Sequence, residues 1–213
     1  MFKGRFKHRK EAGKRLAEKL LEYRGKPTIV FAIPRGGVVT AYEIAKVLEV
    51  PLDIIIPRKI GAPGNKELAI GAVTEDGTTI LNTHLVNMLG ISDAYIELEK
   101  AKQIQEIQRR VKTYRGENLP KDFAGKIVIL VDDGIATGAT VRAAIHSLIK
   151  GNPSLIIVAI PVGPPDTIQE LKREVDKLIC LTADESFFAI GQFYEDFSQV
   201  PDKDVIDLLR KIK

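Results

Sequence analysis

The sequence has little of what stabilises secreted or membrane proteins. Its 213 residues include a single cysteine, Cys180, and no tryptophan. One cysteine forms no intramolecular disulfide and offers no metal-type spacing, so Cys180 is expected to be a buried thiol in a reducing compartment. No apolar run approaches the roughly 20 residues of a membrane span. The charged N-terminus also lacks the apolar stretch of a signal peptide. We therefore expect a soluble, cytoplasmic protein.

Neither sign of charge dominates the chain. There are 32 basic and 28 acidic residues, for a net charge of +4, which by itself does not indicate nucleic-acid binding. The basic residues gather near the N-terminus. They form either a solvated helix face or a surface that faces phosphate. Apolar side chains between them predict that this stretch packs on the body: Phe2, Phe6, Leu16, Ala17 and Leu20. We expect neither a nucleic-acid partner nor a membrane.

Short apolar, β-branched runs alternate with helical patterns. Strands are predicted at 28–33, 52–57, 126–131, 154–160 and 176–181. Helical patterns at 38–50, 139–150 and 166–175 lie between them. Continuous apolar runs are typical of strands buried on both faces, and their alternation with helices predicts an α/β fold with a doubly wound, mostly parallel sheet.

Two stretches depart from this alternation. Gly61, Pro63 and Gly64 predict an irregular, mobile loop, and Asp76-Gly77 predicts a hairpin turn between two short strands. Residues 83–114 look helical, with an apolar stripe at Tyr95, Leu98, Ile104, Ile107 and Val111. This helix is either a surface helix or an oligomer contact.

The C-terminal part is rich in aromatic side chains, followed by a helix predicted over 202–212. The aromatic residues are Phe187, Phe188, Phe193, Tyr194 and Phe197. They form either a small core beneath a long loop or a wall on which a planar ligand stacks.

The stretch that indicates chemistry is KIVILVDDGIATGATVR, residues 126–142. Asp132 and Asp133 follow a strand, where open α/β sheets bind their ligands. A Thr/Gly loop then opens a helix, whose free N–H groups and dipole suit a phosphate. Two carboxylates beside a phosphate make sense if they accept hydrogen bonds from sugar hydroxyls or hold a divalent cation, directly or through water. The pattern therefore predicts a sugar phosphate ligand.

Other phosphate motifs are absent from the sequence. It contains no G-x-x-x-x-G-K-[ST] string and no G-x-G-x-x-G string. A phosphorylatable aspartate would leave the TGAT loop unexplained. A capped turn without a ligand would leave two acids at a buried strand end without compensation.

VILVDDGIATGAT, residues 128–140, resembles the phosphoribosyl pyrophosphate (PRPP) signature of type I phosphoribosyltransferases. The resemblance implies that family's fold, with a flexible β-hairpin loop, a helical insertion and a C-terminal hood. It also implies that Asp132 and Asp133 face the ribose. The 5′-phosphate would bind to Ala136, Thr137, Gly138, Ala139 and Thr140.

Further residues match the family by position. AIPRGGV, residues 32–38, resembles the diphosphate loop, which implies diphosphate binding by Arg35, Gly36 and Gly37. Arg58 and Lys59 resemble basic residues that neutralise the diphosphate. Residues 61–80 match the flexible loop that closes over PRPP, where Lys66 or Glu67 could complete the site. The acceptor pocket would draw on Pro161, Val162 and Gly163.

The resemblance implies a Mg²⁺-dependent phosphoribosyltransferase with PRPP and a small-molecule acceptor, a nucleobase, as substrates. Asp132 and Asp133 would hold the metal directly or through water, and Arg35, Arg58 and Lys59 would assist the leaving diphosphate. Ala136 replaces the acid that 6-oxopurine enzymes usually carry, which counts against those acceptors. The alternative is a regulator of the same fold that senses PRPP or a nucleotide without catalysis.

The whole chain is also similar to stand-alone prokaryotic members of the family whose acceptor is unassigned. The matching stretches are Phe6–Gly13, Arg58–Pro63 and Gly191–Phe197. We expect one domain over 1–213, with a core at 27–182, a helical insertion at 83–114 and a hood at 183–213. Family members usually form homodimers, and we expect the same here.

Overall fold

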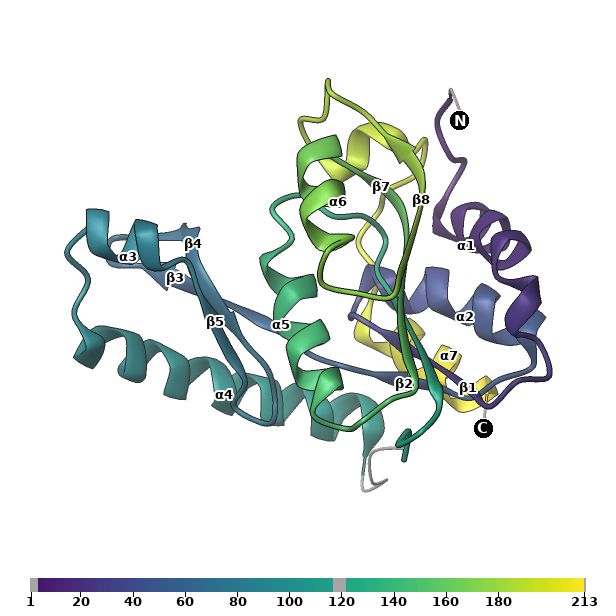
Figure 1. Cartoon of the computed structure of the whole chain (residues 1–213), viewed down its shortest axis with the longest axis horizontal. Helices are drawn as coiled ribbons and strands as arrows, with labels where there is room; N and C mark the ends of the chain where they lie inside the picture. The colour runs from purple at the N-terminus through teal and green to yellow at the C-terminus, as the bar shows by residue number, and fades with distance from the viewer. Residues whose placement is uncertain (1–3, 117–121, 213) are drawn as a thin grey trace.

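A five-stranded parallel sheet forms the centre of the protein, in a computed structural model that describes residues 4–116 and 122–212. The strand order is β2-β1-β6-β7-β8, and every neighbouring pair is parallel (Figure 1). The strands are β1 Thr28–Ala32, β2 Leu52–Ile54, β6 Ile127–Val131, β7 Leu155–Gly163 and β8 Lys177–Ala183. Each lies within or overlaps a predicted strand, so the sequence prediction of a mostly parallel α/β sheet is confirmed.

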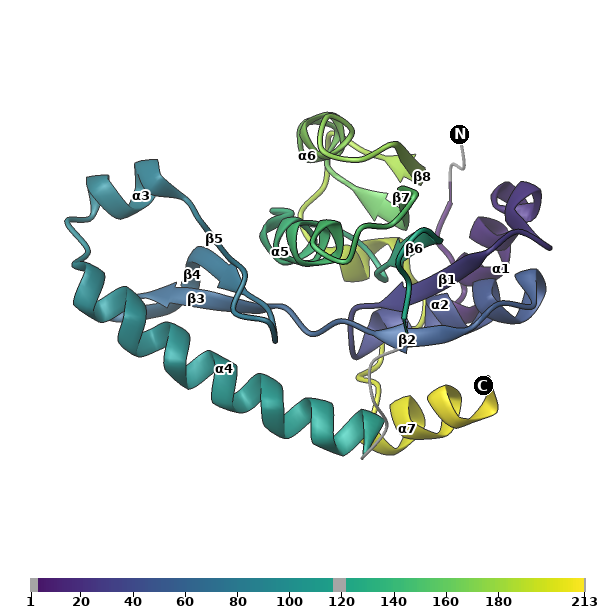
Figure 2. The ribbon, with the colours of Figure 1, turned by 60° about the horizontal axis from the view of Figure 1, so that its bottom comes forward.

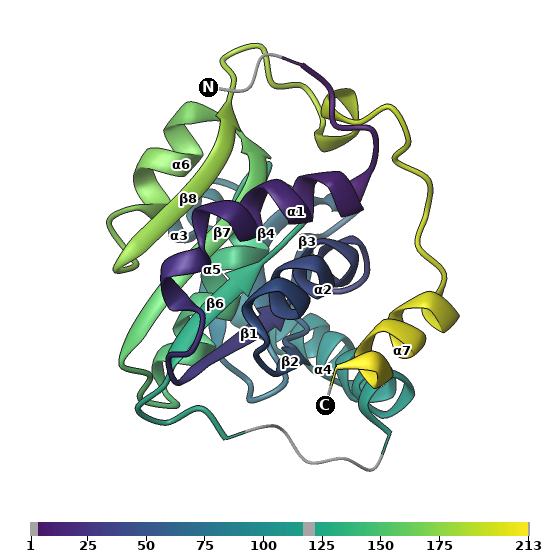
Figure 3. The same ribbon diagram turned by 90° about the vertical axis from the view of Figure 1, so that its right-hand side faces the viewer.

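Helices cover both faces of this sheet (Figure 3). Residues of β1 alternate between the two cores, with Val30 and Ala32 on one side and Ile29 and Phe31 on the other. One core includes α1 Arg9–Lys19, α2 Gly36–Leu48 and α7 Asp202–Lys211, and the other includes α5 Ala139–Ile149 and α6 Pro165–Leu171. A 3₁₀ turn, η1 Leu21–Tyr23, connects α1 to β1.

The N-terminal segment packs on the body, as its apolar side chains predicted. Phe6, Leu16, Ala17 and Leu20 are fully buried, whereas Phe2 lies outside the described residues. The basic residues of α1 other than Arg9 therefore surround a buried stripe.

Residues 58–115, which we call the arm, extend from the sheet (Figure 2). The arm contains an antiparallel sheet, with β3 Arg58–Ala62, β4 Asn65–Val73 and β5 Thr79–Leu81, and the helices α3 Thr83–Met88 and α4 Asp93–Arg115. The hairpin predicted at Asp76-Gly77 is confirmed.

The irregular loop predicted at 61–64 is wrong at Gly61, which is part of β3 and pairs with Ala69. Pro63 and Gly64 form the turn between β3 and β4. The strand register shifts on both sides of Gly61, and a Cβ at this position would lie 2.7 Å from the Lys66 backbone. Glycine here permits a close crossing within a sheet and does not break the sheet.

The helix predicted over 83–114 is two helices. Gly90 adopts a φ of 61° after α3, and the Ser92 side chain then caps α4 by accepting from the Tyr95 N–H. Leu98 was predicted to be buried but is 57% exposed, whereas Ile107 is fully buried. In the described parts of the chain, no helix has the length and apolar character needed to cross a membrane.

Most of the C-terminal aromatic residues form a small core with the N-terminal segment. Phe6, Phe193 and Tyr194 are buried together with Val162 in this cluster. The Phe6 N–H donates to the Phe193 carbonyl at 2.7 Å, next to the turn η2 Ile190–Phe193. Phe188 differs from the rest because it is 92% exposed.

Candidate active site

The two glycine-rich loops of the predicted site leave the sheet side by side. β1 and β6 pair in parallel from Thr28 opposite Ile127 to Ala32 opposite Val131. Ile33 continues this pairing, since its N–H donates to the Val131 carbonyl at 3.0 Å. The PRGG loop and the paired acids therefore meet at the carboxyl edge of the sheet, where α/β proteins bind their ligands.

Gly36 and Gly37 lie directly against the two acids. A Cβ on Gly36 would be 1.8 Å from Asp133 Oδ2, and one on Gly37 would be 3.0 Å from the Cα and Oδ1 atoms of Asp132. No side chain fits between the PRGG loop and the acids. This contact explains why both positions are glycine, and it places the first N–H groups of α2 beside the carboxylates.

Asp132 and Asp133 are adjacent acids with little access to water. Burial and the neighbouring Asp133 carboxylate raise the pKa of Asp132 well above its usual value. Burial also raises the pKa of Asp133, although Arg9 opposes the rise. The Asp133 N–H donates to Asp132 Oδ1 at 2.8 Å. Such a pair favours a ligand that brings hydrogen-bond donors or a cation.

Arg9 contacts this pair of acids from α1. Its Nε lies 2.6 Å from Asp133 Oδ2, and both side chains are almost buried. The Tyr194 hydroxyl donates to the Asp133 carbonyl at 2.7 Å, and burial raises the pKa of this phenol. From the sequence, neither residue was given a role beside the acids, although Tyr194 was named among the C-terminal aromatic residues. Arg9 lies within the Phe6–Gly13 stretch, which offered a signal, but no spacing rule connects residue 9 to residue 133.

The loop that follows the acids leads into α5, with Gly138 as the last residue before the helix. Gly138 has a φ of 74° and is the N-cap of this 11-residue helix. Ala136 and Thr137 are exposed, and the Thr167 hydroxyl donates to the Ala136 carbonyl at 3.0 Å. The first N–H groups of a helix have no partner within it, and its dipole favours an anion. The loop therefore has the chemistry of a phosphate site.

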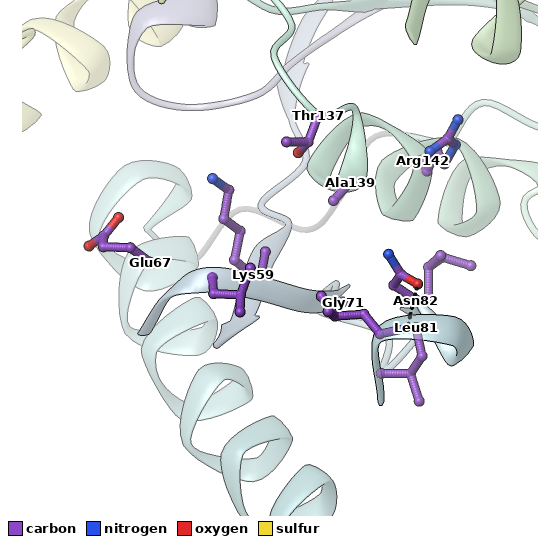
Figure 4. Close-up of a pocket in the computed structure, with 12 residues that line it drawn as sticks. Lys59, Glu67, Gly71, Leu81, Asn82, Thr137, Ala139 and Arg142 are labelled. Atoms are coloured by element: carbon purple, nitrogen blue, oxygen red, sulfur yellow. Dashed lines mark hydrogen bonds between the residues drawn. The ribbon is translucent and has the colours of Figure 1, made fainter. Parts of the chain in front are cut away.

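A cavity of about 510 Å³ separates this loop from the arm. Figure 4 shows Lys59 extending from β3 into the cavity, on the side where Thr137 lies. The arm contributes apolar walls, and α5 contributes Arg142, which pairs with Glu170 and Glu174. The lining residues are Lys59, Glu67, Leu68, Ala69, Gly71, Ile80, Leu81, Asn82, Leu85, Thr137, Ala139 and Arg142.

Arg35 and Arg58 both have partners within the protein. Arg35 Nη1 lies 3.6 Å from Asp202 Oδ1 on α7. Arg58 Nε donates to Gln103 Oε1 on α4 at 2.5 Å, and burial together with the nearby Arg110 lowers the pKa of Arg58. The diphosphate role of these two arginines stays a prediction.

Pro161, Val162 and Gly163 end β7 next to the acid loop, but all three are buried. The Ile135 N–H donates to the Val162 carbonyl at 2.9 Å. A Cβ on Gly134 would contact both Val162 and Ile190, so the C-terminal segment covers this end of the strand. Their role as an acceptor pocket stays a prediction.

Known proteins resemble the chain over nearly its whole length. The family described as "Phosphoribosyl transferase domain" matches residues 5–198. Two Mycobacterium tuberculosis proteins, both named "Putative phosphoribosyl transferase", are 39% identical over 204 residues, which is 96% of this chain and 46% of theirs. This chain thus spans about half the length of the curated relatives it matches.

Solved structures show the same architecture. TT1426 from Thermus thermophilus has a TM-score of 0.83 at 38% identity, covering 98% of this chain and 99% of that one. A purine phosphoribosyltransferase from Pyrococcus horikoshii shares the fold, with a TM-score of 0.51 at 20% identity over 91% of this chain and 90% of its own. The matched range of 5–198 includes the paired acids, the PRGG loop and the TGAT loop. The chain therefore belongs to the phosphoribosyl transferase domain family.

Proposed function

We propose that this chain transfers the 5-phosphoribosyl group of PRPP to an acceptor and releases diphosphate. The observation that carries the proposal is the packing of Gly36 and Gly37 on Asp133 and Asp132. This contact joins an N–H-rich turn and paired carboxylates on neighbouring strands, one loop away from the start of α5. PRPP has matching groups in the same order, a diphosphate, a ribose diol and a 5′-phosphate.

Each part of PRPP has a proposed binding element. The 5′-phosphate binds to residues 136–140 at the start of α5, and the ribose hydroxyls donate to Asp132 and Asp133. The diphosphate accepts from the N–H groups of Arg35, Gly36 and Gly37. Lys59 adds positive charge from the arm, because its side chain extends into the cavity beside the TGAT loop.

The reaction breaks the bond between C1′ and the diphosphate oxygen and forms a bond from C1′ to the acceptor. Positive charge develops on the ribose ring in the transition state, as in glycosyl transfer. The proton that the acceptor loses passes to water or to the diphosphate. The protein contributes alignment of the two substrates and stabilisation of charge on the leaving group.

Mg²⁺ fits this site as a metal shared with the substrate. In residues 4–116 and 122–212, no group of three His, Cys, Asp or Glu side chains is placed to hold a metal. Asp132, at the carboxyl end of β6, would be the protein ligand, directly or through water, and oxygens of PRPP would be further ligands. When bound, the metal neutralises charge on the diphosphate.

The acceptor is proposed to be a nucleobase that lacks the 6-oxopurine pattern, because Ala136 stands where those enzymes carry an acid. Phe188 offers an exposed ring for stacking on a planar acceptor in the segment 183–213, the proposed hood. The second candidate function is a sensor of PRPP or of a nucleotide. It is favoured by one observation, that the guanidinium groups of Arg35 and Arg58 already have partners on α7 and α4.

Calorimetric titration of PRPP, with and without Mg²⁺, tests this proposal on the wild-type chain and on Asp132→Asn/Asp133→Asn. We expect Mg²⁺-dependent binding that the double variant loses, and release of diphosphate with one acceptor from a panel of purine and pyrimidine bases. Binding without diphosphate release from any base would favour the sensor. Absence of PRPP binding would reject both the transferase and a PRPP sensor.

A further inference from the structure

Arg9 joins four parts of the chain that are distant in sequence. It lies on α1, and its Nε donates to Asp133 Oδ2 at 2.6 Å, 124 residues away. Its Nη1 donates to the Ser198 carbonyl at 2.9 Å, and its guanidinium lies 3.9 Å from the centre of the Phe197 ring. A Cβ on Gly36 would lie 2.7 Å from Arg9 Nε, so the PRGG loop also lies against this side chain.

The Asp133 carboxylate is therefore fixed at one of its two oxygens. Arg9 binds Oδ2, while the Tyr194 hydroxyl holds the backbone carbonyl of the same residue at 2.7 Å. A guanidinium is a permanent donor with a rigid geometry, and its contact with Phe197 and Ser198 limits its own movement. Of the two carboxylate oxygens, Oδ1 is the one that Arg9 does not bind, and we take it as the acceptor for a ligand hydroxyl.

The charge of Arg9 also distinguishes the two acids. A cation 2.6 Å from Asp133 repels a divalent metal at that carboxylate but does not prevent a hydroxyl from donating to it. Asp132 forms no ion pair with any of the described residues, and its Oδ1 accepts from the Asp133 N–H at 2.8 Å. Paired acids can accept from a sugar hydroxyl or bind a metal ion. Asp133 is suited to the hydroxyl and Asp132 to the metal.

We propose that Arg9 is a positioning residue that orients Asp133 as an acceptor for one ribose hydroxyl and keeps the metal on the Asp132 side. This inference rests on the proposed function, because it assigns a part of PRPP to each acid. It adds a residue from outside the signature to the site.

The test compares ligands that differ by one hydroxyl, in the absence of metal. Ribose 5-phosphate, 2-deoxyribose 5-phosphate and 3-deoxyribose 5-phosphate are titrated by calorimetry in the presence of a chelator. The proteins are the wild type, Arg9→Gln, Arg9→Lys and the matched control Arg15→Gln. Arg15 lies on the same helix but pairs with Glu11 near the surface.

In the wild type, removal of the hydroxyl that contacts Asp133 is expected to weaken binding by about tenfold, because hydrogen bonds to charged groups are strong. We call the dissociation constant of the deoxy ligand divided by that of ribose 5-phosphate the hydroxyl ratio. In Arg9→Gln the hydroxyl ratio should fall below about twofold, while binding of inorganic phosphate stays unchanged. Arg9→Lys keeps the charge but one ammonium cannot reproduce the fork to Asp133 and Ser198, so an intermediate ratio is expected. Arg15→Gln should keep the wild-type ratio.

A purely structural role for Arg9 would lower thermal stability in Arg9→Gln and leave the hydroxyl ratio unchanged, which would overturn the inference. If Arg9→Gln does not fold, Arg9→Lys decides, and a wild-type ratio in that variant overturns the inference in the same way. If the wild type binds PRPP but its hydroxyl ratio for ribose 5-phosphate equals that of Arg9→Gln, only this inference is rejected. A wild-type protein that does not bind PRPP rejects the proposed function itself.

Discussion

The Tyr114 hydroxyl donates a hydrogen bond of 2.6 Å to Asp202 Oδ1, the same oxygen that lies 3.6 Å from Arg35. Tyr114 is near the end of α4 in the arm, Asp202 begins α7, and Arg35 is in the PRGG loop. A single carboxylate thus connects the arm and the C-terminal helix to the proposed diphosphate site.

Asp202→Asn is expected to tighten the binding of inorganic diphosphate. The amide oxygen can still accept from Tyr114, but the negative charge that competes for Arg35 is removed. Both charged side chains are partly exposed, so water screens their attraction and the pair contributes about 1 kcal/mol or less. The expected gain in affinity is therefore about fivefold at most, measured by calorimetry at low salt. Unchanged or weaker binding would show that Asp202 does not compete with diphosphate.

Tyr114→Phe is expected to lower the free energy of unfolding by about 1 kcal/mol, through loss of one hydrogen bond. The stabilisation by Tyr114 should also depend on pH in alkaline solution. Burial and the bond to Asp202 raise the pKa of Tyr114 to about 12, from about 10 in an unfolded chain. A raised pKa means that the folded state holds the proton more tightly. Its contribution to stability is therefore complete below about pH 10 and is lost as the pH rises toward 12.

Urea unfolding of wild type and Tyr114→Phe at a series of pH values measures this contribution. The difference in unfolding free energy between the two proteins should shrink as the pH rises through that range. A difference that stays constant with pH would contradict the assignment.

Gly36→Ala should damage the site more than Gly37→Ala. An added Cβ at residue 36 would overlap Asp133 Oδ2, whereas at residue 37 it would lie 3.0 Å from Asp132, which a small shift relieves. We expect Gly36→Ala to cost about 1–3 kcal/mol of stability and to weaken PRPP binding by about 100-fold, because small misplacements at a site are costly. Calorimetry and thermal melting of both variants check the order. Equal effects at the two positions would contradict the close approach to Asp133.

Asp76→Ala is expected to loosen the arm from α5. Burial favours a raised pKa for Asp76, but hydrogen bonds from Thr74, Thr78 and Lys150 outweigh it and hold the pKa below its usual range. Ser147 also donates to this carboxylate at 3.1 Å, and both Ser147 and Lys150 lie at the end of α5. Loss of these bonds should cost about 1–3 kcal/mol.

The stabilisation that the Asp76 carboxylate provides should decrease in acid. A lowered pKa means that its stabilisation is present above about pH 4, the ordinary value for an aspartate, and is lost as the pH falls below it. Hydrogen exchange of β4 and β5 should therefore accelerate in acid for the wild type, and at all pH values for Asp76→Ala. Exchange in β1 and β6 serves as the internal control, and acceleration confined to those central strands would contradict the prediction.

The sheet and the loops at its carboxyl edge could be predicted because their signals are local. The acids of 132–133 follow directly on an apolar strand, and the TGAT loop follows directly on the acids. The break at Gly90 was missed although a glycine after an apolar stretch is a common signal for the end of a helix. In the structure Gly90 adopts the positive φ that such an end requires. The contact of Arg9 with Asp133 was missed because it is purely tertiary. Helix α1 had to be placed against the loop that follows β6 before an arginine in a basic stretch could be distinguished from its solvated neighbours.

The bond between Arg9 and Ser198 has a consequence for synthesis on the ribosome. These residues are 189 positions apart, so the sheet can assemble while residues beyond β8 are still unmade. Domains grow from the N-terminal end during translation, and long-range contacts form late. A nascent chain that ends before Tyr194 would have its acids, PRGG loop and TGAT loop but would lack Tyr194, Phe197 and Ser198 around Arg9. Competence to bind a ribose would then arise only after residues 194–198 have been translated.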